Sequence, residues 1–205
     1  AIVNTSSIIN YGPNILTSDP KFADTDGADN IAGTLDDDLR LLPHSPAIDS
    51  GHNGAAVVSN DIRGATRIFN NVVDLGAYES HFSLSLVGGS HQSSPANTTF
   101  IKPLALQLSS SFNDPVGSNL PITFTAPLTG ASITSPTLVA TSSVTGYISV
   151  FVIANSMPGS YSVLATLLSY PPITFVLSNT LKTQSDFQTY IPLIVKELDP
   201  DLELD

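Results

Sequence analysis

Apolar and polar residues alternate with a period of two through most of this chain, the pattern of β-strands that bury one face. The segment Leu104-Ala-Leu-Gln-Leu108 is the clearest case, because its leucines fall on every second position. Helices would need apolar residues three and four positions apart, and such spacings are almost missing. The sequence therefore predicts an all-β protein.

Residues 81–180 are predicted to form an antiparallel β-sandwich. This stretch has little charge and many Ser, Thr, Val, Leu and Pro residues. Short strands at roughly even spacing, separated by turn signals, are typical of a sandwich. The expected strands are Phe82–Val87, Leu104–Leu108, Ile122–Thr125, Thr137–Ala140, Tyr147–Ile153, Ser160–Thr166 and Ile173–Leu177. We expect this domain to fold independently of residues 1–80.

Residues 1–80 are predicted to be the end of a solenoid. Residues 1–15 alternate short apolar pairs with Asn, Ser and Thr, as one coil of a parallel β-solenoid does. One coil cannot bury its own face, so it should stack on a cap or on a neighbouring chain. The remainder is loop-rich, with short strands expected at Leu39–Leu42 and Val72–Tyr78.

Both ends of the chain suggest a larger polypeptide or an assembly. The first nine residues already have a strand pattern, so we expect the chain to be the C-terminal part of something longer. The final region, residues 181–205, combines an apolar strand-like segment, Tyr190–Val195, with an acidic run at Glu197–Asp205. Such charge runs are usually solvated ends.

The composition excludes several classes of function. Forty-one per cent hydrophobic and 12% charged residues predict a packed core. The net charge of −11 and the singly spread Lys and Arg residues argue against nucleic-acid binding. The absence of cysteine excludes disulfides and thiolate metal sites. No apolar run is long enough to predict a membrane span.

An aspartate cluster predicts a calcium site. Six carboxylates fall within fifteen residues on glycine-bearing turns: Asp24, Asp26, Asp29, Asp36, Asp37 and Asp38. The segment starts like an EF-hand loop but has Leu35 where a bidentate Glu would close the shell. We therefore expect a looser calcium loop as the only cofactor site. The alternative is a solvated acidic loop held by Asx-turns.

Four further positions carry predictions of lesser weight. Arg63 and Arg67 are expected to neutralise buried carboxylates such as Asp49, Asp61 or Asp74, or else to lie on the surface. Asp49, in SPAIDSG, is expected to accept backbone N–H bonds at a turn, with a catalytic role as the less favoured alternative. The hydroxyl of Tyr161 is expected to bond the backbone across a corner of the sandwich.

The motifs DPKFAD, DNIAGTLDDDLRL, SPAIDSG, DIRGATRI and VDLGAYE follow one another within residues 1–79. In this order they resemble the C-terminal end of bacterial secreted right-handed parallel β-helix repeat proteins. That family is related to polymorphic outer-membrane proteins and to surface proteins with C-terminal anchors. PITFTAP and PGSYSVLAT resemble bacterial immunoglobulin-like repeats of adhesins. The resemblance implies the final coil and cap of a parallel β-helix, its last strand turn at Gly76–Glu79, followed by an immunoglobulin-like β-sandwich.

These observations together predict a non-catalytic structural or adhesive protein of the bacterial cell surface or the extracellular space. Its expected partners are upstream β-helix coils or neighbouring copies of itself, in a fibre or surface layer, and surface glycans. The alternative is the C-terminal, non-catalytic part of a secreted β-helix carbohydrate-active enzyme, whose catalytic coils would precede Ala1. A carbohydrate-binding module is less favoured because the chain has no Trp to stack on sugars.

Overall fold

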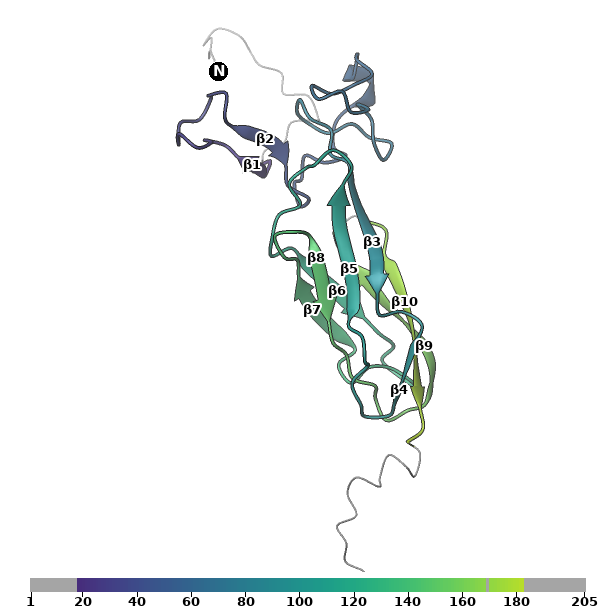
Figure 1. The fold of residues 1–205 in the computed structure, drawn as a ribbon. Coiled ribbons are helices and arrows are strands. Elements are labelled where there is room, and N and C mark those ends of the chain that lie inside the picture. Colours follow the sequence, from purple (N-terminus) through teal and green to yellow (C-terminus); the bar gives the residue numbers. More distant parts are fainter. Residues whose placement is uncertain (1–17, 169, 183–205) are drawn as a thin grey trace, which may run out of the picture.

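A computed structural model describes residues 18–168 and 170–182, and within them the fold is all-β (Figure 1). Residues 18–80, which we call the cap, are mostly irregular and lie at one end of a two-layer sandwich formed by residues 81–180. The expected solenoid coil of residues 1–15, the apolar segment at 190–195 and the acidic tail lie outside the described residues.

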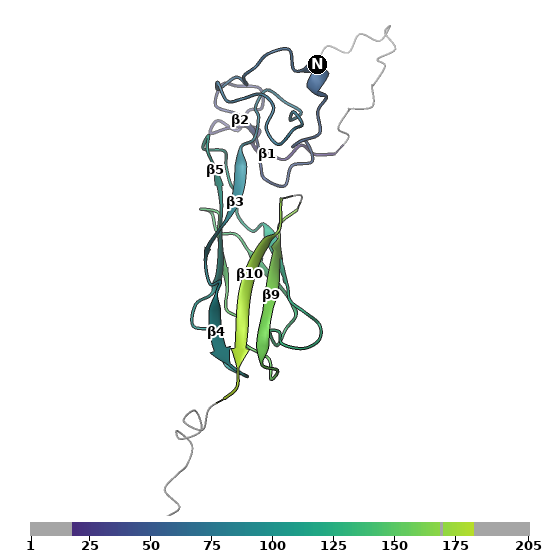
Figure 2. The same ribbon diagram turned by 90° about the vertical axis from the view of Figure 1, so that its right-hand side faces the viewer.

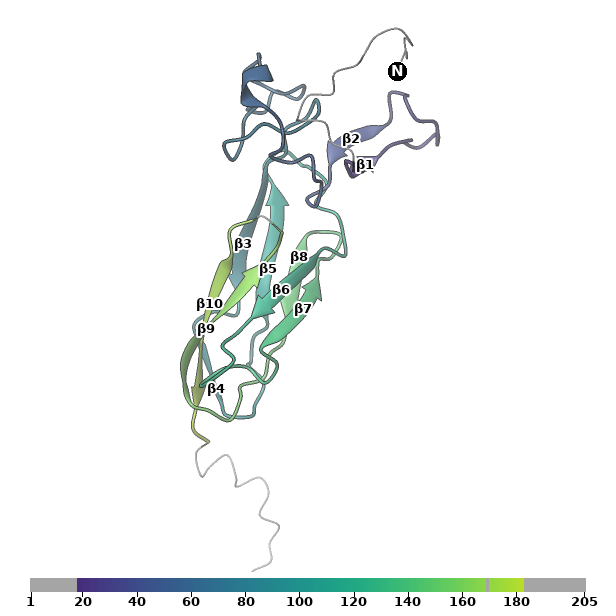
Figure 3. The ribbon, with the colours of Figure 1, turned by 180° about the vertical axis from the view of Figure 1, so that it is seen from behind.

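Eight strands of the sandwich form two sheets that face each other (Figures 2 and 3). The first sheet has the order β3 (Phe82–Gly88), β5 (Leu104–Ser110), β8 (Tyr147–Val150). The second has the order β4 (Gln92–Pro95), β10 (Ile173–Thr180), β9 (Gly159–Thr166), β6 (Pro121–Thr125), β7 (Thr137–Thr141). All neighbours are antiparallel except β4, which runs parallel to β10.

All seven strands predicted in this region are present. The prediction missed β4, because four mostly polar residues carry no apolar alternation. It also extended β8 too far: the ladder ends at Val150, and Ile153 makes only an isolated bridge to Thr99.

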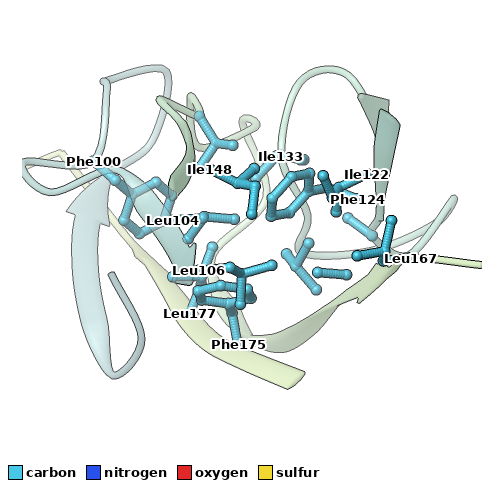
Figure 4. Packing of buried hydrophobic residues seen from close by; sticks show 14 of the residues in the cluster. Phe100, Leu104, Leu106, Ile122, Phe124, Ile133, Ile148, Leu167, Phe175 and Leu177 are labelled. Atoms are coloured by element: carbon cyan, nitrogen blue, oxygen red, sulfur yellow. The ribbon is translucent and has the colours of Figure 1, made fainter. Parts of the chain in front are cut away.

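The sandwich core is built from the inward positions of both sheets (Figure 4). In β9, Tyr161, Val163 and Ala165 are buried while the residues between them are exposed. Phe124 of β6 and Phe175 of β10 flank β9, and their ring centroids lie 6.0 Å apart. The two rings are tilted by 45° to each other, within the range of geometries that aromatic pairs adopt in protein cores.

The cap contains one short antiparallel pair, β1 (Phe22–Asp24) with β2 (Asp38–Leu41), and a 3-10 turn at Asn53–Ala55. The β2 strand agrees with the prediction for Leu39–Leu42.

The strand predicted at Val72–Tyr78 is wrong, and so is the strand turn expected at Gly76–Glu79. Backbone and side-chain groups of other cap loops satisfy this backbone in place of a neighbouring strand. The N–H of Gly51 donates to the carbonyl of Val73, and the N–H of Leu75 donates to the carbonyl of Ala47. The N–H of Val73 donates to Asn53 Oδ1, and the carbonyls of Asp74 and Gly76 accept from the Arg67 guanidinium. Because these partners come from scattered positions and many are side chains, the segment is not part of a continuous ladder.

Three features of the sandwich bring it against the cap. The strand β3 begins directly after the cap, the β5–β6 loop holds Asp114, and the β9–β10 loop holds Tyr170. These loops meet the cap at the end where β5 and β9 terminate and β10 begins. The charged and aromatic side chains that could form a functional site lie at this junction between the cap and the sandwich.

Candidate functional site

The predicted calcium loop is closed by hydrogen bonds between its own carboxylates and its backbone. Asp36 Oδ2 accepts from the N–H groups of Ala28 (2.7 Å) and Asp29 (3.1 Å). The Thr34 hydroxyl donates to Asp36 Oδ1 at 2.6 Å. These bonds to Thr34 and to the backbone lower the pKa of Asp36.

Two more of the predicted calcium ligands, Asp24 and Asp37, also accept hydrogen bonds from backbone N–H groups of the loop. Asp24 Oδ1 accepts from the N–H of Gly27 at 3.1 Å, and Asp37 Oδ2 accepts from the N–H of Gly33 at 2.6 Å. Such Asx-type contacts hold turns that would otherwise leave backbone donors unpaired.

Asp38 contacts Arg40 and no backbone N–H group of the loop between Asp24 and Asp37 within the described residues. It forms an ion pair with Arg40, with an N–O distance of 2.6 Å, and this contact lowers the pKa of Asp38. Arg40 in turn donates to the carbonyl of Asn113 in the sandwich at 2.6 Å.

The six aspartates do not converge on one point. Across residues 18–168 and 170–182, no group of three or more His, Cys, Asp or Glu side chains is placed to hold a metal ion. Oxygens of Asp24, Asp29, Asp36 and Asp37 accept from backbone N–H groups of the same loop, as in Asx-turns, and the calcium site stays a prediction.

At the junction, Arg63 of the cap holds two buried carboxylates. Its guanidinium lies 3.2 Å from Asp61 and 2.5 Å from Asp114, whose side chains are 0% and 2% exposed. It also donates to the carbonyl of Glu79 at 2.8 Å. The pairing with Asp61 agrees with the prediction. Asp114 was missed, although it is the only acidic residue between residues 81 and 180.

Arg67 pairs with a different carboxylate from those predicted. It lies 2.9 Å from Glu79, whose side chain is fully buried, and it forms no ion pair with Asp49 or Asp74. Glu79 also accepts from the N–H groups of Phe69 (2.8 Å) and Asp74 (3.0 Å). Burial raises the pKa of Glu79 to about 7, against the opposing effect of these donors and of Arg67.

His81, the first residue of the sandwich, contacts both the cap and the β5–β6 loop. Its ring lies between Phe69 of the cap and Phe112 of the β5–β6 loop, with centroid distances of 4.3 and 4.7 Å. Its N–H donates to Asp114 Oδ2 at 3.0 Å, and its Nε2 lies 3.2 Å from the carbonyl oxygen of Thr66. Charged and aromatic contacts thus join cap and sandwich.

A cavity of about 270 Å³ opens beside this network, between the cap and the β9–β10 loop. Asp49 and Tyr170 are among the residues that line it. Burial and the neighbouring charge of Asp74 raise the pKa of Asp49 to about 6. The predicted role of Asp49 is wrong in detail: its carboxylate accepts no backbone N–H within the described residues. Its own N–H donates to Asp74 Oδ1 at 2.8 Å.

Tyr161 lies at the opposite end of the sandwich, and its predicted backbone bond is replaced by a side-chain bond. Its hydroxyl donates to Asn179 Oδ1 at 2.9 Å. The amide of the buried Asn179 donates to the carbonyl of Ser132 and to Asn155 Oδ1, both at 2.8 Å. This network joins the loops at the end of the sandwich that lies away from the cap. None of these polar groups is both exposed and chemically reactive.

Comparison of the chain with models of protein families gives no match, and comparison with curated proteins gives none. Within the described residues, no helix has the length and hydropathy needed to cross a membrane.

Proposed function

We propose that this chain is a non-catalytic structural or adhesive protein of the bacterial cell surface or extracellular space, which packs against copies of itself. The observation that carries the proposal is the outer face of the five-stranded sheet. Its outward residues, by strand register, include Thr123, Thr125, Val139, Ser162, Leu164, Thr174 and Val176.

This face has no charged residue in any of its five strands. Val139, Leu164 and Val176 on it are 61%, 43% and 37% exposed. Between residues 82 and 180, the only Lys, Arg, Asp or Glu residues are Lys102 and Asp114, and Asp114 is buried. Soluble proteins usually keep sheet faces and edges apart with charges, so an uncharged face favours contact with another protein surface.

The edge of the same sheet supports self-association. The strand β7 ends the five-stranded sheet, and its residues Thr137–Thr141 include neither Pro nor a charged side chain. An edge of this kind is a template for pairing with a second chain.

We further propose that the sandwich is immunoglobulin-like. The strand order supports this, because in variable-type immunoglobulin domains one sheet is likewise enlarged to five strands by strands added to a set of three. The buried tyrosine on β9, Tyr161, two residues before the buried Val163, adds to the support. For the cap, the identity as the end of a β-helix rests on the sequence resemblance.

Sedimentation velocity on the full chain over a wide concentration range tests the proposal. We expect concentration-dependent association that the double variant V139K/L164K weakens by like-charge repulsion. The matched control is V144K in the β7–β8 turn, since Val144 is 78% exposed but lies off this face. A monomer at every concentration, or an equal effect of V144K, would contradict self-association through this face.

A further inference from the structure

The cavity at the junction has the features of a ligand site, and it is independent of the sheet face discussed above. It is lined by parts of four segments: Asp49 from the SPAIDSG turn, Asn70 and Asn71 from a second cap loop, Ser80 and Phe82 around the start of β3, and Tyr170 from the β9–β10 loop. At about 270 Å³ it lies just below the range of drug-sized pockets, so it suits one side chain or one sugar ring.

The carboxylate of Asp49 is the charged group of this cavity. Among residues 18–168 and 170–182, no Lys, Arg or His side chain forms an ion pair with it, and no donor bonds its oxygens. A second carboxyl group, that of Asp74, acts on it, and Asp74 Oδ1 accepts from the Asp49 N–H at 2.8 Å. The nearby Arg67 is committed to Glu79. The electrostatic potential in the cavity is therefore negative when Asp49 is ionised, and a cation would be attracted to it.

The remaining walls combine apolar and amide surface. Ile48, Phe82, Pro171 and the ring of Tyr170 supply carbon atoms, while Asn70 and Asn71 supply polar groups at the rim. A cation carried on a hydrocarbon body gains from such a setting, because its charge meets a carboxylate and an aromatic ring while its carbon atoms lose water.

We propose that this cavity binds a primary ammonium group on a compact carbon skeleton, with Asp49 as its counter-ion. Two sources share that chemistry: the end of a lysine side chain on a partner protein, and an amino sugar with a free amine. A neutral sugar would leave the carboxylate unpaired, and an anion would be repelled by Asp49 and Asp74.

The proposal predicts a pH dependence, since only the ionised carboxylate attracts the ammonium. The groups facing Asp49 are Asp74 from the cap and Tyr170 from the β9–β10 loop; Asp114 of the β5–β6 loop acts on Tyr170 in turn. Asp74 disfavours ionisation of Asp49, and neither Tyr170 nor Asp114 favours it. With a pKa of about 6, Asp49 is largely protonated at pH 5 and ionised at pH 7.5, which implies about tenfold weaker binding at pH 5.

Nitrogen-15 NMR titration of the full chain tests the site with two probes, N-acetyl-lysine methylamide and glucosamine. Their matched controls without an ammonium group are N-acetyl-norleucine methylamide and N-acetylglucosamine. We expect saturable shifts at Asn70, Asn71 and Tyr170 with at least one probe, little effect of its control, and at least a tenfold loss of affinity in D49N. The variant D26N, in the exposed acidic loop, should bind like the natural chain.

The pattern of responses identifies the source of the ammonium. Shifts with the lysine probe alone indicate a protein partner, those with glucosamine alone indicate a glycan, and shifts with both indicate recognition of the amine itself. Absence of saturable shifts with both probes up to about 20 mM would overturn the proposal. Equal binding by D49N, or equal binding of the controls, would also overturn it.

Discussion

The Arg63 guanidinium in the cap lies 2.5 Å from the Asp114 carboxylate in the sandwich, and the same guanidinium also pairs with Asp61. Asp114 is held from its own side by the N–H of His81 and the hydroxyl of Ser110. One arginine thus compensates two carboxylates, one from each region, at a place where water has little access.

Replacing Arg63 should therefore cost far more than replacing an exposed cation. R63M leaves Asp61 and Asp114 as buried, uncompensated charges, and we expect a loss of about 3–5 kcal/mol in the free energy of unfolding. Urea denaturation followed by circular dichroism measures it. The control K21M breaks the exposed pair with Asp19, where the cost should be about 0–1 kcal/mol. Equal costs for the two variants would show that the Arg63 pairs contribute nothing to stability.

Asp49 should make the protein less stable as the pH rises. Its pKa in the folded state, about 6, lies above its ordinary value of 3.8. A carboxyl with a raised pKa contributes stability below pH of about 4, and this contribution is lost as the pH rises through about 6. D49N lacks this titration, so its advantage over the natural chain should grow between pH 4 and pH 7. Asp49 has a φ of 52°, a conformation that Asn tolerates, so D49N should fold. If the melting temperatures of D49N and of the natural chain differ by the same amount at every pH in this range, the role of Asp49 is refuted. Glu79 contributes with the same sign to both chains and cancels in the comparison.

Gly51 should not accept a side chain. A Cβ at this position would lie 2.6 Å from the carbonyl oxygen of Val73, to which the Gly51 N–H donates at 2.7 Å. G51A must push the two cap segments apart, and we expect a loss of about 1–3 kcal/mol in unfolding free energy. The control is G88A, because a Cβ at Gly88 meets no atom within 4 Å. A thermal melt in which both variants behave alike would contradict this close approach.

Calcium should change the stability of the chain little. In the acidic loop, Asp24 Oδ1, Asp36 Oδ2 and Asp37 Oδ2 already accept from backbone N–H groups, which hold the loop closed. Melting temperatures with excess calcium and with a chelator should therefore agree. A ligand that binds only the folded state must raise its stability, so a higher melting temperature with calcium would establish the site that the sequence predicts.

The isolated segment 81–180 should fold alone but less stably than the full chain. Most of its core is self-contained, since the cluster of fully buried residues runs from Phe82 to Leu177. Separation from the cap leaves Asp114 without Arg63 and exposes the face of His81 that packs on Phe69. We expect a β-type circular dichroism spectrum and a cooperative transition at a lower temperature. A non-cooperative or helical product would show that the sandwich needs the cap.

The sequence by itself determined the strands in which apolar and polar residues alternate, because this pattern assigns a buried and an exposed face without reference to the neighbouring strands. In β9 the pattern Tyr161, Val163, Ala165 already assigns one face to a core, because side chains on a strand point alternately to its two sides. The same reasoning found β5, β6 and β10. It could not find β4, whose residues Gln92–Pro95 become a strand only because β10 supplies a parallel partner.

The tertiary structure alone decided what each charged group does. Asp114 lies 51 positions from Arg63 along the chain, so nothing local predicts their contact. The acidic loop shows the same limit: the spacing of Asp24 to Asp38 suits a metal, but whether oxygens face an ion or a backbone N–H depends on how the loop closes. Asp49 became a candidate ligand group because folding placed it beside Asp74 and Tyr170, where no Lys, Arg or His side chain of the described residues forms an ion pair with it. Hydrophobic pattern is a property of neighbours in sequence, whereas charge compensation and desolvation are properties of neighbours in space.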